Sequence, residues 1–290
     1  MITIASDRLH ATISPDGAEL QTLRDQAGRD YLWNGDPHWW TGRAPLLFPI
    51  VGTLGGDSLR IDGRDYAMAK HGFARRSTFS VTDSTADRAT FRLTPSEATR
   101  AAYPFDFRLD VEFALAGATL TMAATLTNPG AVPLPASFGF HPAFRWPLPD
   151  AGAREDHQLR FAEPEPAPIR RIDGHGLVTP TQHPSPVVGR TLPLEDGLFA
   201  DDAIIFDRLA SDALEYGAPD QPGLHVSWEG LPQLGVWTRP GAPYLCIEPW
   251  QGHSDPQGFA GDFRAKPGVI LVPPGEDRRF TMRVTVQAAG

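Results

Sequence analysis

An alternation of apolar and polar side chains, with a period of two residues, constrains the fold of this chain more than any other feature. In residues 105–113, FDFRLDVEF, five apolar side chains alternate with four charged ones. Successive side chains of a β-strand point to opposite faces, so this segment is a half-buried strand. Similar alternation occurs in residues 118–127, 223–228 and 279–286, and clusters of Gly, Pro, Asn and Asp separate these segments. The pattern predicts an all-β fold, namely a large antiparallel β-sandwich.

The length and composition favour a single globular domain that covers residues 1–290. All-β sandwiches reach a length of 290 residues as one unit. Hydrophobic residues make up 41% of the sequence and charged residues 21%, as in folded proteins rather than disordered or fibrous ones. The 28 glycines and 29 prolines supply the many chain reversals that a multistranded antiparallel sheet requires.

Charge and cysteine content limit the partners and the compartment. A formal net charge of -9 argues against a nucleic-acid surface, because phosphate neutralisation requires clustered Lys and Arg. The start, MITIASDRLH, lacks the pattern of a signal peptide, and no stretch approaches the roughly 20 apolar residues of a membrane span. Cys246 is the only cysteine, so no internal disulfide can form and a cytoplasmic location fits best.

Three segments depart from the strand pattern. Residues 94–104 predict one short helix, with Thr94 as N-cap, Pro95 at the first helical position and Pro104 closing the segment. Residues 147–190, rich in Pro, Asp and His, have the weakest periodicity and are interpreted as long loops. The glycine-rich GTLGGD (52–57) does not match a dinucleotide-binding pattern and is interpreted as a hairpin.

The stretch 244–255, YLCIEPWQGHSD, places a carboxylate in an otherwise apolar strand that we expect to end at Pro249. If residues 244–248 are extended, Tyr244, Cys246 and Glu248 share one face. A strand glutamate is usually an ordinary surface carboxylate. The neighbouring Trp250 weakens that interpretation and keeps open the alternative that this face belongs to a site.

Two further stretches contain histidines. In PASFGFHPAFRWP (135–147), His141 projects opposite two phenylalanines and Pro142 holds it extended, although a lone histidine among aromatics is more often a core residue. KHGFARR (70–76), with His71 and Arg75, is by itself only a basic turn. None of the nine histidines has the spacing of a helical ligand pair, so no metal site is predicted, and Cys246 is interpreted as a small strand residue rather than a nucleophile.

Taken together, the ordered set of motifs resembles the aldose 1-epimerase (galactose mutarotase-like) family, in its LacX-like and hexose-6-phosphate-mutarotase-like branch. The matching stretches are GAEL (17–20), YLW (31–33), APLLFPIVG (44–52), HGFAR (71–75), TPSEATRAAYPFDF (94–107), FGFHPAF (138–144), DDAIIF (201–206) and CIEPWQG (246–252). The resemblance implies a β-supersandwich and cofactor-free interconversion of the α and β anomers of an aldose. It also implies catalytic roles for His141 and Glu248.

These residue types suit mutarotation chemically. The reaction needs a base for the anomeric hydroxyl proton and an acid for the ring oxygen, and we expect Glu248 and His141 to serve, on opposite sides of the sugar. Reference pKa values of about 4.3 and about 6.5 predict an ionised carboxylate and a partly protonated imidazole near neutrality. We expect His71 to assist by hydrogen bonding the sugar, and Trp250 or Trp237 to stack on its apolar face. Both tryptophans are equally compatible with a place in the core.

The motifs leave the sugar open. LFPIVGTL stands where galactose enzymes carry an asparagine- and arginine-rich stretch, and HGFAR replaces their HGG-type segment. In the hexose-6-phosphate branch, arginines near HGFAR meet the phosphate, which implies this role for Arg75 or Arg43. Asp202 falls where the family often supplies a ligand for a sugar hydroxyl. The expected partner is therefore a free or phosphorylated sugar.

Two other functions are compatible with the motifs. The chain could be a non-catalytic sugar-binding or regulatory domain, because a fold does not determine its function. A glycoside hydrolase usually needs two carboxylates across the bond, whereas the matched motifs supply one carboxylate and one histidine. We rank the epimerase first, the sugar-binding domain second and the hydrolase third.

Overall fold

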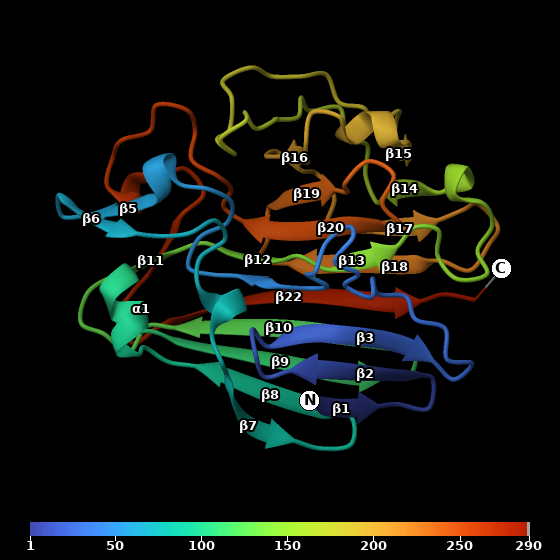
Figure 1. The fold of residues 1–290 in the computed structure, drawn as a ribbon, viewed down its shortest axis with the longest axis horizontal. Helices are drawn as coiled ribbons and strands as arrows, with labels where there is room; N and C mark the ends of the chain where they lie inside the picture. Colours follow the sequence, from blue (N-terminus) through green and yellow to red (C-terminus); the bar gives the residue numbers. More distant parts are fainter. Residues whose placement is uncertain (289–290) are drawn as a thin grey trace.

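The computed structural model describes residues 1–288, and strands form most of the regular structure (Figure 1). The largest sheet has nine strands. In spatial order these are β15 (Thr191–Pro193), β14 (Gln158–Phe161), β17 (Ala213–Gly217), β18 (Leu224–Glu229), β22 (Asp277–Val286), β10 (Thr119–Thr127), β9 (Arg108–Ala116), β8 (Arg88–Leu93) and β7 (Ser80–Ser84).

A second sheet of six strands carries the residues of interest. Its order is β16 (Ile204–Phe206), β19 (Gln233–Trp237), β20 (Tyr244–Gln251), β12 (Phe138–Phe140) and β4 (Leu46–Leu47), and β13 (Ala143–Arg145) also pairs with β20. The smaller sheets are β1 (Ile2–Ala5), β2 (Leu9–Ser14) and β3 (Glu19–Asp25), then β11 (Leu134–Ala136) with β21 (Ile270–Val272), and β5 (Ser58–Ile61) with β6 (Arg64–Ala67). All pairings between these strands are antiparallel, which confirms the predicted all-β sandwich.

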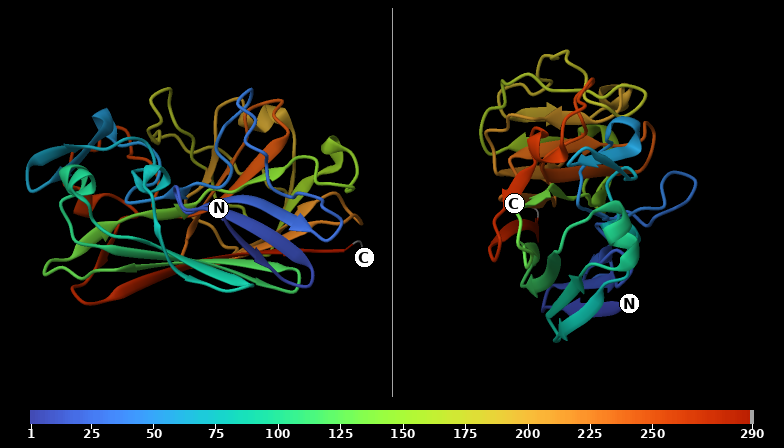
Figure 2. Two further views of the ribbon diagram at one scale, coloured as in Figure 1. Left: turned by 60° about the horizontal axis from the view of Figure 1, so that its bottom comes forward. Right: turned by 90° about the vertical axis from the view of Figure 1, so that its left-hand side faces the viewer.

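The sheets pack face to face around a large apolar core, with two smaller apolar clusters beside it. The six-stranded sheet lies over one part of the nine-stranded sheet, and the sheet of β1, β2 and β3 lies against β8 and β9 (Figures 1 and 2). Phe138 of β12 stacks on Phe280 of β22 with ring centroids 5.0 Å apart. Each buried side chain of this size contributes roughly 1.5–3 kcal/mol to folding. The largest cluster draws its residues from nearly the whole chain, from Ile4 to Val284, which supports the prediction of a single domain; this stays a prediction.

The alternation in residues 105–113 is confirmed by burial. Its five apolar side chains are at most 5% exposed, and β9 and β10 pair along nine residues. The strand itself is shifted, because β9 covers Arg108–Ala116 and residues 105–107 precede it. The predicted helix is shifted: α1 covers Glu97–Ala102, and its N-cap is Ser96 rather than Thr94. The Ser96 hydroxyl accepts a hydrogen bond from the Thr99 N–H at 3.2 Å, while Thr94, which precedes a proline, is disfavoured from the helical region.

Two loop predictions are resolved by the structure. Residues 147–190 are mainly loops, as predicted, although β14 and the short 3₁₀-helix η3 (Arg154–Asp156) lie within them. The segment 52–57 is not itself a hairpin. It contains the 3₁₀-helix η1 (Gly55–Asp57), and the hairpin of β5 and β6 begins only after it.

The strand β20 continues through Pro249 to Gln251, so the prediction that Pro249 ends it is wrong. The Ile247 N–H donates to the Pro142 oxygen, and the nitrogen of Pro249, two residues further, points to the same side of the strand. By the register of these strands, Pro249 lies opposite Phe140, the last residue of β12, next to the interruption at His141 and Pro142. The missing N–H therefore falls where the ladder between β12 and β20 ends, and a proline is tolerated there.

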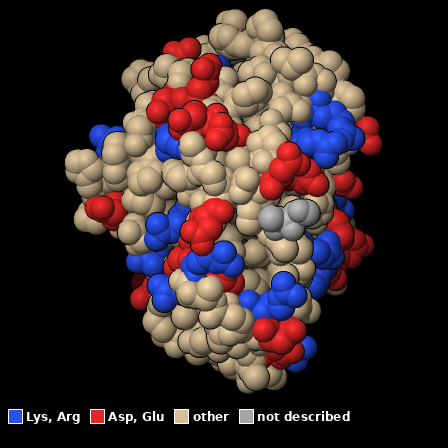
Figure 3. All heavy atoms as spheres, turned by 90° about the vertical axis from the view of Figure 1, so that its right-hand side faces the viewer, with Lys and Arg blue, Asp and Glu red and all other residues tan. Residues whose placement is uncertain are grey.

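Charged side chains of both signs are interspersed on the face that Figure 3 shows. That face therefore carries no continuous basic patch of the kind that binds a nucleic-acid backbone. In the described part of the chain, no helix has the length and apolarity to cross a bilayer.

The indole of Trp250 lies against two glycines. Trp250 is opposite Gly139 of β12, and its ring extends over Gly235 of β19. A Cβ atom added to Gly235 would lie 2.4 Å from this ring, and one added to Gly139 would lie 2.6 Å from it. Both glycines therefore create the space in which the indole lies flat beside Glu248.

We predict that Gly235→Ala displaces the Trp250 ring and lowers the free energy of unfolding by about 1–3 kcal/mol, the usual cost of overpacking. Urea denaturation and near-ultraviolet circular dichroism measure the two effects. Gly174→Ala is the control, since nothing lies within 4 Å of its added Cβ and its φ is not positive. Wild-type stability and an unchanged aromatic spectrum for Gly235→Ala would contradict this packing.

Candidate active site

Glu248 is buried at the wall of a cavity of about 260 Å³ and is only 2% exposed. Its strand, β20, lies between β19 and β12, and this central position holds the carboxyl group rigidly. The lining residues are Trp40, Gly52, Lys70, His71, Arg75, Arg76, His141, Ile172, Asp202, Ala203, Ile205, Trp237, Glu248, Trp250 and Ser254. The interpretation of Glu248 as a surface carboxylate is therefore wrong, because tryptophans cover this face of the strand.

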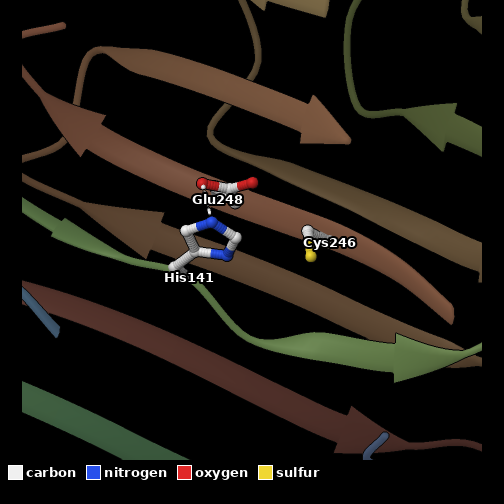
Figure 4. Close-up of side chains that lie close together, drawn as sticks. All are labelled: His141, Cys246 and Glu248. Atoms are coloured by element: carbon white, nitrogen blue, oxygen red, sulfur yellow. Dashed lines mark ion pairs between the residues drawn. The ribbon is translucent and has the colours of Figure 1, made fainter. Parts of the chain in front are cut away.

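His141 lies directly beside Glu248. Phe138 and Phe140 point into the core, and His141 follows them on the opposite face, as the alternation predicts. Its Nε2 is 3.3 Å from Glu248 Oε2, and Figure 4 shows the imidazole directed at the carboxyl group. The prediction that the two groups lie on opposite sides of the sugar therefore needs correction: they are neighbours.

Burial reverses the protonation states expected from the reference pKa values. It raises the pKa of Glu248 well above its usual range, against the opposing charge of Lys70. It lowers the pKa of His141 to about 3, with help from the Arg75 charge. Desolvation disfavours every charged form, so burial shifts the pair towards a carboxylic acid beside a neutral imidazole. Both shifts run opposite to the ionised carboxylate and partly protonated imidazole that the reference pKa values predict.

A reciprocal contact with Gly52 fixes His71. The backbone N–H of His71 donates to the backbone oxygen of Gly52 at 2.8 Å, and the backbone N–H of Gly52 donates to the ring nitrogen Nδ1 of His71 at 3.1 Å. Because Nδ1 accepts, the proton of the neutral ring is on Nε2. Burial and the nearby His141 and Lys70 hold the pKa of His71 well below its usual range. His71 is thus a neutral hydrogen-bond donor at the cavity.

Residues 254–255, which follow β20, form hydrogen bonds with the loop 52–55 that contacts His71. Ser254 Oγ accepts from the Thr53 N–H at 3.0 Å, and Asp255 Oδ2 accepts from the Gly55 N–H at 2.8 Å. The polar residues after the EPW motif therefore act on the loop 52–55, and through Gly52 on His71. The sequence pattern gave no sign of this contact, since the partners are about 200 residues apart.

Two tryptophans cover the pair. The ring of Trp40 lies over the imidazole of His141, with centroids 5.0 Å apart and an angle of 31° between the planes. Trp237 contacts both rings edge-on, at 5.8 Å from Trp40 and 6.2 Å from His141. Sequence reasoning missed Trp40, because an apolar residue in a loop has no spacing that distinguishes a site from the core.

Three cations line the cavity: Lys70, Arg75 and Arg76. Arg75 and Arg76 belong to the 3₁₀-helix η2 (Ala74–Arg76), which follows His71 directly. None of the ion pairs among residues 1–288 includes any of these three side chains. Burial lowers the pKa of Arg75 from its usual value, so its charge is only partly hydrated. This cluster can accept an anionic group.

Of the remaining predicted site residues, Asp202 and Trp250 line the cavity and Arg43 does not. Asp202 lines the cavity with a positive φ of 64°, and its Oδ1 accepts from the Ala203 N–H at 2.7 Å. Trp250 also lines the cavity. Arg43 does not, because its Nη1 donates to the Gln21 oxygen at 2.8 Å, away from the lining residues.

One group within residues 1–288 has the composition of a metal site: His141, Cys246 and Glu248. A ligand atom from each lies within 4.8 Å of the others. Burial raises the pKa of the Cys246 thiol well above its usual range. The thiol is therefore neutral, as its interpretation as an inert strand residue implies.

Comparisons of the sequence and of the fold with known proteins agree on one family. Residues 1–285 match the family described as aldose 1-epimerase. The chromosomal protein LacX of Lactococcus lactis is 30% identical, over 98% of this chain and 99% of that protein. A galactose mutarotase related enzyme from Lactobacillus acidophilus superposes with a TM-score of 0.92 at 29% identity, over 99% and 97% of the two chains. A galactose mutarotase-like protein from Lactobacillus casei gives 0.90 at 29% identity, over 99% and 100%. The sequence resemblance is thus confirmed, and the chain belongs to the aldose 1-epimerase family.

Proposed function

We propose that the protein is an isomerase, an aldose 1-epimerase that interconverts the α and β anomers of a hexose or hexose phosphate by general acid/base ring opening. The observation that carries this proposal is the buried pair of Glu248 and His141, 3.3 Å apart at the wall of a cavity of about 260 Å³. The two oxygens of a hemiacetal that exchange protons are bound to the same carbon. An acid and a base that serve both oxygens must therefore be neighbours, as these residues are.

Ring opening requires that Glu248 and His141 together hold one proton, which is on His141 at the start of the reaction. Glu248, as carboxylate, takes the proton of the anomeric hydroxyl while the carbonyl at C1 forms. The bond from C1 to the ring oxygen breaks, and His141, as imidazolium, gives its proton to that oxygen. The carbonyl end then rotates about the bond to C2, and the reverse transfers close the ring on the other face. No proton is gained or lost by the pair as a whole.

The environment favours this assignment of acid and base. When Glu248 acts as the base, the open-chain intermediate meets a neutral acid and a neutral imidazole, the state that burial stabilises. The opposite assignment would leave an ion pair in the buried site at the same stage, at a greater desolvation cost. We therefore assign Glu248 as the base and His141 as the acid.

Two neighbouring side chains support the reaction. His71 presents an Nε2–H donor at the cavity and can hold a sugar oxygen without supplying a proton itself. Trp40 places its aromatic face over His141, which favours the imidazolium form by roughly 0.5–2 kcal/mol. The indole of Trp250 and the edge of Trp237 offer apolar surface to the sugar ring.

We predict that Glu248→Gln and His141→Asn each lower the catalysed anomer exchange by roughly 10²- to 10⁴-fold, the usual worth of one positioned acid or base. Glu248→Gln keeps the shape of the side chain and removes its basicity. Polarimetry or exchange NMR measures the rate, and circular dichroism checks folding. Glu276→Gln, at an exposed glutamate that does not line this cavity, is the matched control.

The outcomes separate the candidate functions. Near-wild-type exchange in either variant would remove that residue from its proposed role. A wild-type protein that binds a sugar but exchanges the anomers of none would support a non-catalytic binding domain, and Glu248 would then be a ligand for a sugar hydroxyl.

We further propose that the preferred sugar is phosphorylated. Lys70, Arg75 and Arg76 line the cavity and have no ion-pair partner within residues 1–288. Arg75 is only partly exposed, so water hydrates its guanidinium group incompletely. A bound phosphate would supply the hydrogen-bond acceptors that the missing water does not. Arg43, the alternative from the sequence, does not line this cavity.

Arg75→Ala tests this proposal. A charge-assisted hydrogen bond contributes about 1.5–3 kcal/mol, so the wild-type protein should prefer glucose 6-phosphate to glucose by roughly 10- to 100-fold in kcat/KM. Arg75→Ala should lose this preference and keep its activity on glucose. Arg64→Ala, an exposed arginine of β6 outside the cavity, is the control. Equal preference in wild type and Arg75→Ala would exclude Arg75 as the phosphate ligand.

A further inference from the structure

The atoms beside Glu248 include a thiol that the proposed reaction does not use. Cys246 and Glu248 are two residues apart on β20 and therefore share one face. His141 joins them from the interruption between β12 and β13, and Figure 4 shows the three side chains together. The exposed fractions are 0% for Cys246, 2% for Glu248 and 6% for His141. The strand β20 and the neighbouring residue His141 thus bring a sulfur, a nitrogen and an oxygen atom within 4.8 Å of one another.

Two of these three groups contain unpaired polar atoms. Within residues 1–288, His141 Nδ1 and Glu248 Oε2 are buried without a hydrogen-bond partner. Buried polar atoms are nearly always paired, so these atoms need another explanation. A sugar accounts for those that face the cavity, but it leaves the thiol without a role.

We propose that this cluster is a binding site for a thiophilic divalent cation such as Zn²⁺, Cd²⁺ or Co²⁺, held by His141, Cys246 and Glu248, and that the bound ion excludes the sugar. Imidazole, thiolate and carboxylate are all ligands of Zn²⁺, whereas a thiolate disfavours Mg²⁺ and Ca²⁺. The thiolate and the carboxylate together balance the charge of the ion, and the protons of the Cys246 thiol and of the Glu248 carboxyl group are released on binding.

The geometry requires only a small adjustment. The three ligand atoms lie within 4.8 Å of one another. Tetrahedral Zn²⁺ with bonds of about 2.0–2.3 Å separates its ligand atoms by roughly 3.3–3.6 Å, so the widest pair must close by about 1 Å. His141 and Glu248 line the cavity, which gives the ion a path from solvent and leaves its fourth position open to water. Inhibition follows because the ion occupies the lone pairs that proton transfer needs.

Cobalt spectroscopy tests the site without reference to activity. Metal-free wild-type protein titrated with Co²⁺ should bind one ion, with a thiolate-to-cobalt charge-transfer band in the near ultraviolet and the intense visible bands of tetrahedral Co²⁺. Cys246→Ser should abolish the charge-transfer band. The same substitution should weaken Zn²⁺ binding, measured by calorimetry, by at least roughly 10-fold. Removal of a residue that only hydrogen-bonds a zinc ligand already costs that much, and removal of a ligand should cost more. Glu248→Gln should weaken it similarly, whereas Mg²⁺ should not bind.

Inhibition is the second readout, and it rests on the proposed function. Zn²⁺ should slow anomer exchange by wild-type protein, and Cys246→Ser should need at least 10 times more Zn²⁺ for the same inhibition. A cobalt complex without a thiolate band, or equal Zn²⁺ affinity in wild type and Cys246→Ser, would overturn the site. A thiolate band in a protein without exchange activity would keep the site and contradict the proposed function instead.

Discussion

The contact between Glu248 and His141 depends on the register of β12 and β13 against β20. Gly139 pairs with Trp250 and Ala143 pairs with Cys246, so the same register runs through the interruption and places His141 directly opposite Glu248. Residues that lie directly opposite in an antiparallel pair direct their side chains to the same face. The imidazole and the carboxyl group are therefore held 3.3 Å apart within the sheet.

Burial gives this contact its chemical character. Apart from the pair itself, the nearby charges are the cations Lys70 and Arg75 and the carboxylate of Asp202, and desolvation outweighs them in both shifts. Burial therefore shifts the pair towards its neutral form in the empty cavity. In the proposed mechanism, ring opening starts from carboxylate and imidazolium and ends in the neutral pair, so the form that burial favours is the one present when the ring is open.

The sequence was sufficient for the local features and insufficient for the long-range ones. The alternation in residues 105–113 predicted β9 because strand periodicity is a local property, and the FGFHP and EPW motifs identified His141 and Glu248. Their pKa shifts could not be predicted, because reference pKa values contain no information on burial. Trp40 was missed and Arg43 was included because the set of loops that meet at a cavity depends on strand register across the whole chain.

The protonation state of Glu248 in the empty protein tests this account most directly. Carbon-13 NMR of protein labelled at the glutamate side-chain carboxyl groups, compared with Glu248→Gln, identifies the signal of this residue. We predict the shift of a carboxylic acid at neutral pH, with ionisation only well above the usual value of 4.5. A Glu248 signal that is already that of a carboxylate at neutral pH, and that titrates near 4.5 like an exposed glutamate, would contradict the account.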